Sequence, residues 1–232
     1  MPLLQAPALD IDVDAVLRGQ GADPVAIRKR SPRLVEIAER ALDAARPLLQ
    51  PQVLFRQLDV EALRHERLLL GGGVFLSGQL VSEHLGAAKQ VMLVLCTVGA
   101  ALETHAAEVS KDDIVYGLAL DGVGSAAVEA LAHAVCKTFE DQAGEQGMQS
   151  SIPISPGMMG WPVEKGQPEI FAILDPAQID VHLTEFSLMM PRKSLTMTMG
   201  FGPTMNTDGR TCDFCALRET CRYQDHYDRA HA

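Results

Sequence analysis

The sequence has little positive charge, no long hydrophobic run and few cysteines. Lys and Arg total 20 against 30 Asp and Glu, a formal net charge of −10 among 232 residues. Nucleic acids and anionic membranes bind basic proteins, so neither is expected as a partner. The longest apolar run, residues 91–102, is interrupted by Thr97 and Gly99 and is too short to span a bilayer. No basic start precedes an apolar run near Met1, so we expect no secretory signal and a cytoplasmic location.

Three of the five cysteines, Cys212, Cys215 and Cys221, lie close together near the C-terminus. In a reducing compartment, clustered cysteines bind metal or perform redox chemistry more often than they form disulfides. Two cysteines separated by two residues can bind one metal ion, and a third nearby can join them. The cluster therefore predicts an iron–sulfur cluster or a zinc site, with a redox thiol group or an untenanted remnant as alternatives. The candidates for a fourth ligand are Cys96, Cys136, His226, His231 and a side chain of a partner.

The hydrophobic pattern predicts both strands and helices. Residues 90–98 are the clearest strand, because a continuous apolar run is typical of a central strand buried on both faces. Residues 195–201 alternate between large apolar and small or polar side chains, which is typical of a half-buried strand. Further strands are predicted at 53–58, at 68–75 with a bend at its three glycines, and at 181–190. Helices are predicted at 11–17, from Ser31, at 77–85, from Ala100, at 114–139, and with Pro168 in a first turn.

Two acidic residues, Asp121 and Glu129, lie on the predicted helix 114–139, which is otherwise apolar and rich in small residues. Eight residues are about two helical turns, so both acids lie on roughly one face. Acids on an apolar helix can be buried and paired, or can line a pocket. The alternative is that both lie at a solvated edge of the helix, since carboxylates are rarely fully buried.

The stretch 153–175 contains the single tryptophan, Trp161, among many prolines and glycines. Such residues do not suit a helix interior or a central strand, so they predict a shaped loop, followed by a helix. A rigid loop with an aromatic residue and free backbone amides can form a ligand or partner surface. The alternative is a structural turn with Trp161 as a core residue, and the residues alone favour it.

Several motifs occur in an order that resembles the activation (reactivation) domain of cobalamin-dependent methionine synthase. The resemblance covers about residues 10–202 and is closer to stand-alone proteins built on that domain, some of which carry a Cys-rich C-terminal tail. The motifs are the Thr97-Val98-Gly99 turn, the helix with Asp121 and Glu129, Ser155-Pro156-Gly157, Gly160-Trp161-Pro162 with Gln167, and the turn Pro191-Arg192-Lys193-Ser194.

This resemblance implies a fold, a ligand and a partner. The fold is α+β, a single domain at 1–202 with a curved antiparallel sheet flanked by helices, plus a Cys-rich metal- or cluster-binding tail at 203–232. Family members bind S-adenosylmethionine and dock on a corrinoid domain, where they support reductive methylation of cob(II)alamin. The partner, a corrinoid protein or a truncated methionine synthase, carries the cobalamin. The implied cofactor-binding residues are Asp121, Glu129, Ser155, Pro156, Gly157, Met158 and Trp161.

Two positions depart from the family pattern. An arginine and a tyrosine that contact S-adenosylmethionine in the family correspond here to Pro153 and Met158. Losing the arginine weakens the ligand's carboxylate end by about 1.5–3 kcal/mol, or roughly ten- to a hundredfold in affinity. We therefore expect weak or absent binding of free S-adenosylmethionine. We also expect the loop with Trp161 to share a cleft with residues 97–99 and with Asp121 and Glu129.

Three functions follow from these observations. The first is an accessory protein for a corrinoid-dependent methyltransferase, with no complete active site of its own. The second is an iron–sulfur electron-transfer protein that uses the cysteine tail. The third is a corrinoid-protein binding module that does not use S-adenosylmethionine. Whether the chain is itself an enzyme stays open at this stage.

Overall fold

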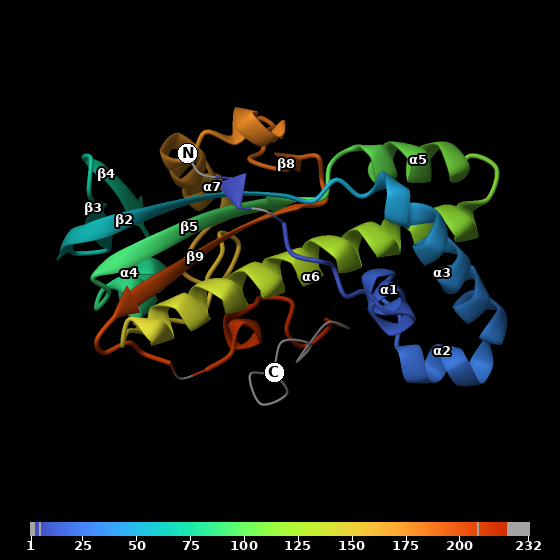
Figure 1. The fold of residues 1–232 in the computed structure, drawn as a ribbon, viewed down its shortest axis with the longest axis horizontal. Coiled ribbons are helices and arrows are strands. Elements are labelled where there is room, and N and C mark those ends of the chain that lie inside the picture. The colour runs from blue at the N-terminus through green and yellow to red at the C-terminus, as the bar shows by residue number, and fades with distance from the viewer. Residues whose placement is uncertain (1–2, 5, 208, 222–232) are drawn as a thin grey trace.

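The computed structural model describes residues 3–4, 6–207 and 209–221, which form a curled antiparallel sheet with helices on both faces (Figure 1). The strand order is β4-β3-β2-β5-β9-β6, and β1 also pairs with β2. The strands are β1 (Leu3–Leu4), β2 (Gln52–Arg64), β3 (Arg67–Leu70), β4 (Val74–Ser77), β5 (Gln90–Thr97), β6 (Gln149–Ser150) and β9 (Ser194–Gly202), with a separate pair, β7 (His182–Leu183) and β8 (Met189–Met190). The predicted α+β fold class is confirmed.

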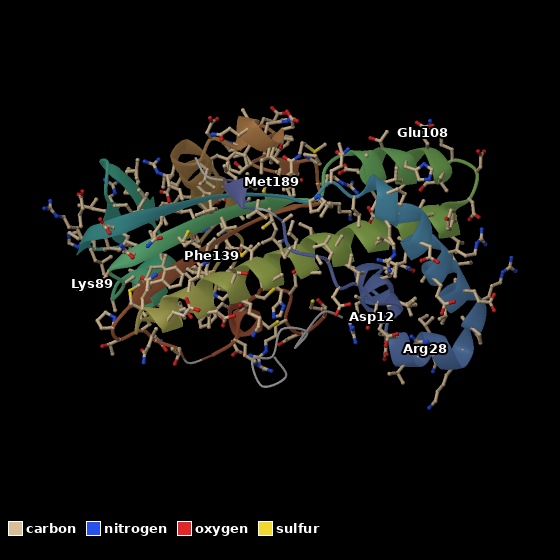
Figure 2. The ribbon with its side chains drawn as sticks, viewed as in Figure 1. Asp12, Arg28, Lys89, Glu108, Phe139 and Met189 are labelled. Atoms are coloured by element: carbon tan, nitrogen blue, oxygen red, sulfur yellow. The ribbon has the colours of Figure 1, made fainter. Side chains whose placement is uncertain are left out.

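Seven α-helices surround this sheet in the described residues. They are α1 (Val13–Gly19), α2 (Pro24–Arg30), α3 (Pro32–Ala45), α4 (Gln79–Leu85), α5 (Ala101–Val109), α6 (Ile114–Glu145) and α7 (Val163–Ile173), with short 3₁₀ turns η1 (Arg46–Leu48), η2 (Pro176–Ile179) and η3 (Thr211–Phe214). Figure 2 shows Asp12, whose side chain caps α1 by accepting from the Ala15 amide at 2.7 Å, and Arg28 of α2, which pairs with Asp14.

Strand β5 is the centre of the sheet and separates two hydrophobic cores. It pairs along its full length with β2 and β9. Because alternate side chains of a strand point to opposite faces, its residues divide between the cores. Val91, Leu93 and Leu95 enter one core, and Met92, Val94 and Cys96 enter the other. The continuous apolar run is thus explained by burial on both faces, as predicted.

The first core lies between the sheet and the long helix α6, together with α1, α3 and α5. Phe139 of α6 packs on Phe55 of β2 with ring centroids 5.2 Å apart (Figure 2). Glycines let neighbouring helices approach closely: a Cβ at Gly122 would lie 2.8 Å from the Val16 carbonyl oxygen of α1. Among the described helices, α6 alone is long and apolar enough to cross a membrane. However, 56% of its most apolar window is buried inside the protein, as in a core helix.

The second core lies on the other face of the sheet, under α4, α7 and the loop after β6. Figure 1 shows α7 and α6 on opposite sides of the sheet. Helix α7 begins at Val163, so Pro168 lies inside the helix and not in its first turn, contrary to the prediction. A proline there leaves the carbonyl of Glu164 without its helical donor, and this is tolerated because both residues are exposed to water.

The predicted strand 181–190 is also wrong. The chain forms instead the hairpin of β7 and β8, closed by a turn in which Ser187 has φ +60°. The Thr184 amide donates to the Leu188 carbonyl, and the Leu188 amide donates to the Thr184 hydroxyl. These local hydrogen bonds bend the segment back on itself, and strand propensity does not reveal them. The bend at residues 71–73 is confirmed, with Gly72 and Gly73 at positive φ.

Candidate functional site

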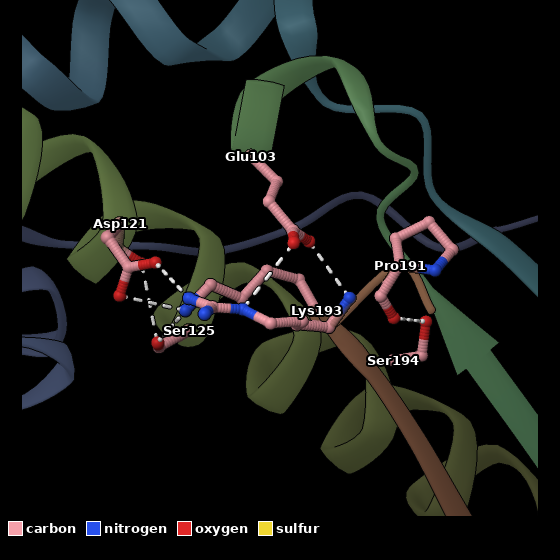
Figure 3. A network of polar contacts seen from close by, with 7 residues as sticks. Glu103, Asp121, Ser125, Pro191, Lys193 and Ser194 are labelled. Atoms are coloured by element: carbon pink, nitrogen blue, oxygen red, sulfur yellow. Dashed lines mark hydrogen bonds and ion pairs between the residues drawn. The ribbon is translucent and has the colours of Figure 1, made fainter. Parts of the chain in front are cut away.

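A network of charged side chains joins α6 to the turn before β9 (Figure 3). The Lys193 ammonium donates to Asp121 Oδ2 and to Ser125 Oγ, each at 2.9 Å. Arg192 lies 3.5 Å from the same Asp121 carboxylate and 3.4 Å from Glu103 of α5. The Glu103 carboxylate also accepts from the Arg192 amide at 2.8 Å. Asp121 is therefore paired with two cations while 32% exposed, and it also lines a cavity between α5 and α6.

The geometry of this turn depends on small residues around it. A Cβ at Gly124 would lie 3.0 Å from Lys193 Cγ, so glycine leaves room for the lysine stem across α6. Ser194 Oγ donates to the Pro191 carbonyl at 2.7 Å and lies 2.9 Å from Thr97 Oγ1. The turns at residues 97–99 and 191–194 are thus held together at one end of β5 and β9. A surface cavity of about 290 Å³ adjoins them between α5 and α6.

The family resemblance implied Asp121 as a cofactor-binding residue, and this network bears on that role. The Asp121 carboxylate already accepts from Lys193, whose side chain is only 12% exposed, and a ligand would have to compete with that ion pair. Sequence reasoning did not select Lys193, Arg192 or Glu103 as site residues. The Pro-Arg-Lys-Ser motif could have indicated Arg192 and Lys193. However, the acidic residues that they contact lie about 70 or more residues away in the sequence, so the motif alone did not reveal them.

The Ser155-Pro156-Gly157 loop runs along the outer edge of β9. Ile154 bridges Thr198, and Ser155 Oγ donates to the Thr196 carbonyl at 2.7 Å. Gly157 has φ +101°, which glycine adopts without strain, and it is exposed. The loop therefore lies at an accessible sheet edge, next to the Met158 side chain.

The expectation of free amides in this loop is wrong. The Ser155 amide lies 3.4 Å from Met158 Sδ, and the Gly157 amide donates to the Trp161 carbonyl at 2.7 Å. The amides of Met158 and Met159 donate to the carbonyls of Ser155 and Phe214. These four amides are engaged within the loop or by the tail, so they do not form a ready cradle for a carboxylate.

Trp161 is a core residue and does not face a cleft. Its side chain is 0% exposed and belongs to the second core. The indole is enclosed by glycines: a Cβ at Gly78 would lie 3.1 Å from its Cδ1, and one at Gly166 would lie 2.6 Å from its Nε1. That Nε1 has no hydrogen-bond acceptor among the described residues. The burial of Trp161 thus supports its interpretation as the core residue of a structural turn.

The predicted cleft shared by Trp161, Asp121 and Glu129 is therefore wrong. Both acids lie on α6, which covers the first core, whereas Trp161 lies in the second core on the other face of the sheet (Figure 1). Glu129 is half-buried. The prediction failed because sequence order does not reveal which face of a sheet a loop will cover.

The cysteine tail packs back onto the domain. Met205 is buried, and the Phe214 carbonyl accepts from the Met159 amide at 2.9 Å. Thr211 Oγ1 donates to the Pro153 carbonyl at 3.3 Å. The Phe214 ring meets His84 of α4 edge-on, with centroids 4.6 Å apart. Residues 203–207 and 209–214 are thus part of the body that contains the Ser155 loop.

No metal site is formed in the part of the chain that the structure describes. Cys212, Cys215 and Cys221 are half-buried and form no disulfide, and no group of three His, Cys, Asp or Glu side chains is arranged to hold an ion there. Cys96 and Cys136, two candidates for a fourth ligand, lie in the first core, away from the tail. Burial raises the pKa of the Cys96 thiol far above its usual value. His226 and His231 lie outside the described residues, so metal binding stays a prediction.

The burial of His84 predicts that the stability of the protein depends on pH. Its side chain is 4% exposed, and its Nδ1 has no partner among the described residues. Burial lowers the pKa of His84, and the nearby Glu83 opposes this more weakly. The unfolded chain, with a histidine pKa of about 6.5, then binds the proton more readily than the folded protein. The free energy of unfolding should therefore decrease as the pH falls below that value.

Urea unfolding at about pH 7.5 and about pH 5.5, on either side of the usual histidine value, measures this effect. His84→Phe should reduce the difference between the two midpoints, because it removes the buried titrating group. The matched control is His105→Asn, an exposed histidine of α5, which should leave the difference unchanged. An equal reduction in both variants would contradict the assignment to His84.

Comparison with known proteins supports the fold. No protein-family model matches the sequence, and no curated protein matches it. A solved structure of the MetH reactivation domain bound to AdoHcy superimposes with a TM-score of 0.64 at 13% sequence identity. The match covers 89% of this chain and 81% of that chain. The described chain therefore has the fold of the MetH reactivation domain, as the motif order predicted.

Proposed function

We propose that this chain is an accessory protein for a corrinoid-dependent methyltransferase and supports the reductive activation or docking of its cobalamin domain. The observation that carries the proposal is the shared fold with the MetH reactivation domain over 89% of the chain. The motifs that suggested this role in the sequence form a turn at the end of β5, a loop at the edge of β9 and the turn before β9. The corrinoid is carried by the partner.

The Ser155 loop is the part of the chain that we assign to this contact. It lies at the sheet edge, and it exposes Gly157 and Met159 to solvent, Met159 at 54%. Ser155, Pro156 and Met158 hold its shape through the bonds described above. Because the loop amides are used internally and Pro153 replaces an arginine, free S-adenosylmethionine is a weak ligand of this surface. The protein's contribution is then to position the partner, whose cofactor supplies the chemistry.

Complex formation with a corrinoid protein tests the proposal. The full chain is mixed with the cobalamin-binding domain of a cobalamin-dependent methionine synthase, in the cob(II)alamin state and in the methylated state. We expect coelution in gel filtration with the cob(II)alamin form and weaker association with the methylated form. An absence of association in every cobalt state would contradict the proposed function.

Two exposed apolar residues offer a matched pair of variants. Met159→Glu places a charge on the Ser155 loop and should abolish the complex. Phe186→Glu places the same charge on the tip of the β7–β8 hairpin, where Phe186 is 73% exposed, and should leave the complex intact. Neither residue is buried, so both variants should fold. Loss of the complex only with Phe186→Glu would refute the assigned surface.

A further inference from the structure

A basic pocket is lined by residues of the β2–β3 hairpin, β4 and α7. Figure 1 shows β3 and β4 at the opposite end of the molecule from α5, whose Glu103 belongs to the Asp121 network. The volume of the pocket is about 480 Å³, within the range usual for small-molecule sites. The hairpin between β2 and β3 supplies Arg64 and Arg67, and α7 supplies Lys165. The remaining lining residues are His65, Glu66, Leu69 and Ser77. Three cations thus converge on one concave surface of a protein whose net charge is −10.

The two arginines are paired directly across the hairpin. Arg64 and Arg67 occupy opposite positions in the register of β2 and β3. Like charges at such positions are destabilising unless something compensates them. Among the described residues, none of Arg64, Arg67 and Lys165 has an ion pair with a carboxylate. A chain with an excess of acids therefore places three cations without an ion-pair partner around one pocket.

Two of the surrounding groups are already fixed. The Arg67 guanidinium lies over the Phe75 ring, 4.3 Å from its centroid, so the arginine is held in place by an aromatic face. Glu169 of α7 accepts from the Ser77 amide at 2.8 Å and from the Ser77 hydroxyl. This carboxylate is thus engaged in joining α7 to β4. Glu66 is the one acid that lines the pocket.

We propose that this pocket binds a small molecule that carries a phosphate or diphosphate group. Guanidinium groups bind phosphate oxygens through paired hydrogen bonds, and a lysine adds a point charge. The concave shape favours a small molecule over the flat surface of an acidic protein. None of the residues that line this pocket belongs to the Ser155 loop, so the proposal does not rest on the proposed function. The compensating charge on the two arginines comes from the ligand.

Calorimetry of the full chain with inorganic pyrophosphate tests the site. At low salt we expect a dissociation constant below about 1 mM, and weakening as the salt concentration rises. Arg64→Gln and Arg67→Gln should each weaken binding about tenfold, the loss of a charged hydrogen bond. Glu66→Gln should tighten binding, because it removes the one negative charge of the lining. Adenosine, which has no phosphate, should not bind.

The matched control is Arg33→Gln, which removes the same charge from an exposed position on α3. Binding to this variant should equal binding to the wild type. Equal weakening by Arg33→Gln and Arg67→Gln would show a general charge effect and overturn the proposal. The absence of a heat signal at millimolar pyrophosphate would overturn it as well.

Discussion

Replacement of Trp161 by alanine is expected to lower the free energy of unfolding by about 3–5 kcal/mol. The indole is fully buried in the second core, between the sheet and the helices α4 and α7. Gly78 and Gly166 lie against it with no side chain that could turn into the vacated space. Removing the ring therefore loses its transfer free energy and leaves a cavity. Urea unfolding monitored by far-UV circular dichroism measures the loss, since the single tryptophan is no longer available as a probe.

Trp161→Phe is the control for this prediction. It keeps an aromatic ring in the core and removes an N–H that has no acceptor among the described residues, so it should cost much less stability. Association with a corrinoid domain should persist in the phenylalanine variant. A Trp161→Ala protein that keeps its stability but loses the partner would show instead that Trp161 belongs to the binding surface.

Removal of the Asp121 charge is expected to cost about 1–3 kcal/mol. Breaking a buried ion pair from one side costs more than this, but Asp121 is 32% exposed and water screens part of the effect. Asp121→Asn leaves the Lys193 ammonium, which is 12% exposed, without its carboxylate partner. Lys193→Met should cost less, because it keeps the stem over Gly124 and leaves Asp121 near Arg192.

The double variant Asp121→Asn with Lys193→Met completes a thermodynamic cycle. Its cost should be smaller than the sum of the two single costs, since the second change removes the charge that the first left unpaired. Thermal or urea unfolding of the four proteins measures the coupling. A strictly additive result, or a larger cost for Lys193→Met than for Asp121→Asn, would contradict the role of this ion pair.

Local sequence patterns determined the central strand and most of the longer helices of this protein, and the order of its motifs determined the fold class. The apolar run at 91–96 predicted the central strand, because only burial on both faces accommodates it. Helix α6 is rich in small residues, and at Gly122 this allows close approach to the Val16 carbonyl of α1. The order of short motifs predicted the fold, which the structural match confirms at 13% identity. Each of these signals depends on neighbours within a few turns or on motif order along the chain.

The tertiary structure decided which residues meet. Asp121 pairs with Lys193, 72 residues further along the chain, and Arg67 and Lys165 line one pocket between a hairpin and a helix. Trp161 follows an exposed loop yet enters the core. Hydrophobic periodicity and secondary-structure propensity indicate which side chains share one face of a helix or strand. They do not indicate which other element covers that face. That choice depends on the pairing of distant strands, and it placed Trp161 and Asp121 on opposite sides of the sheet.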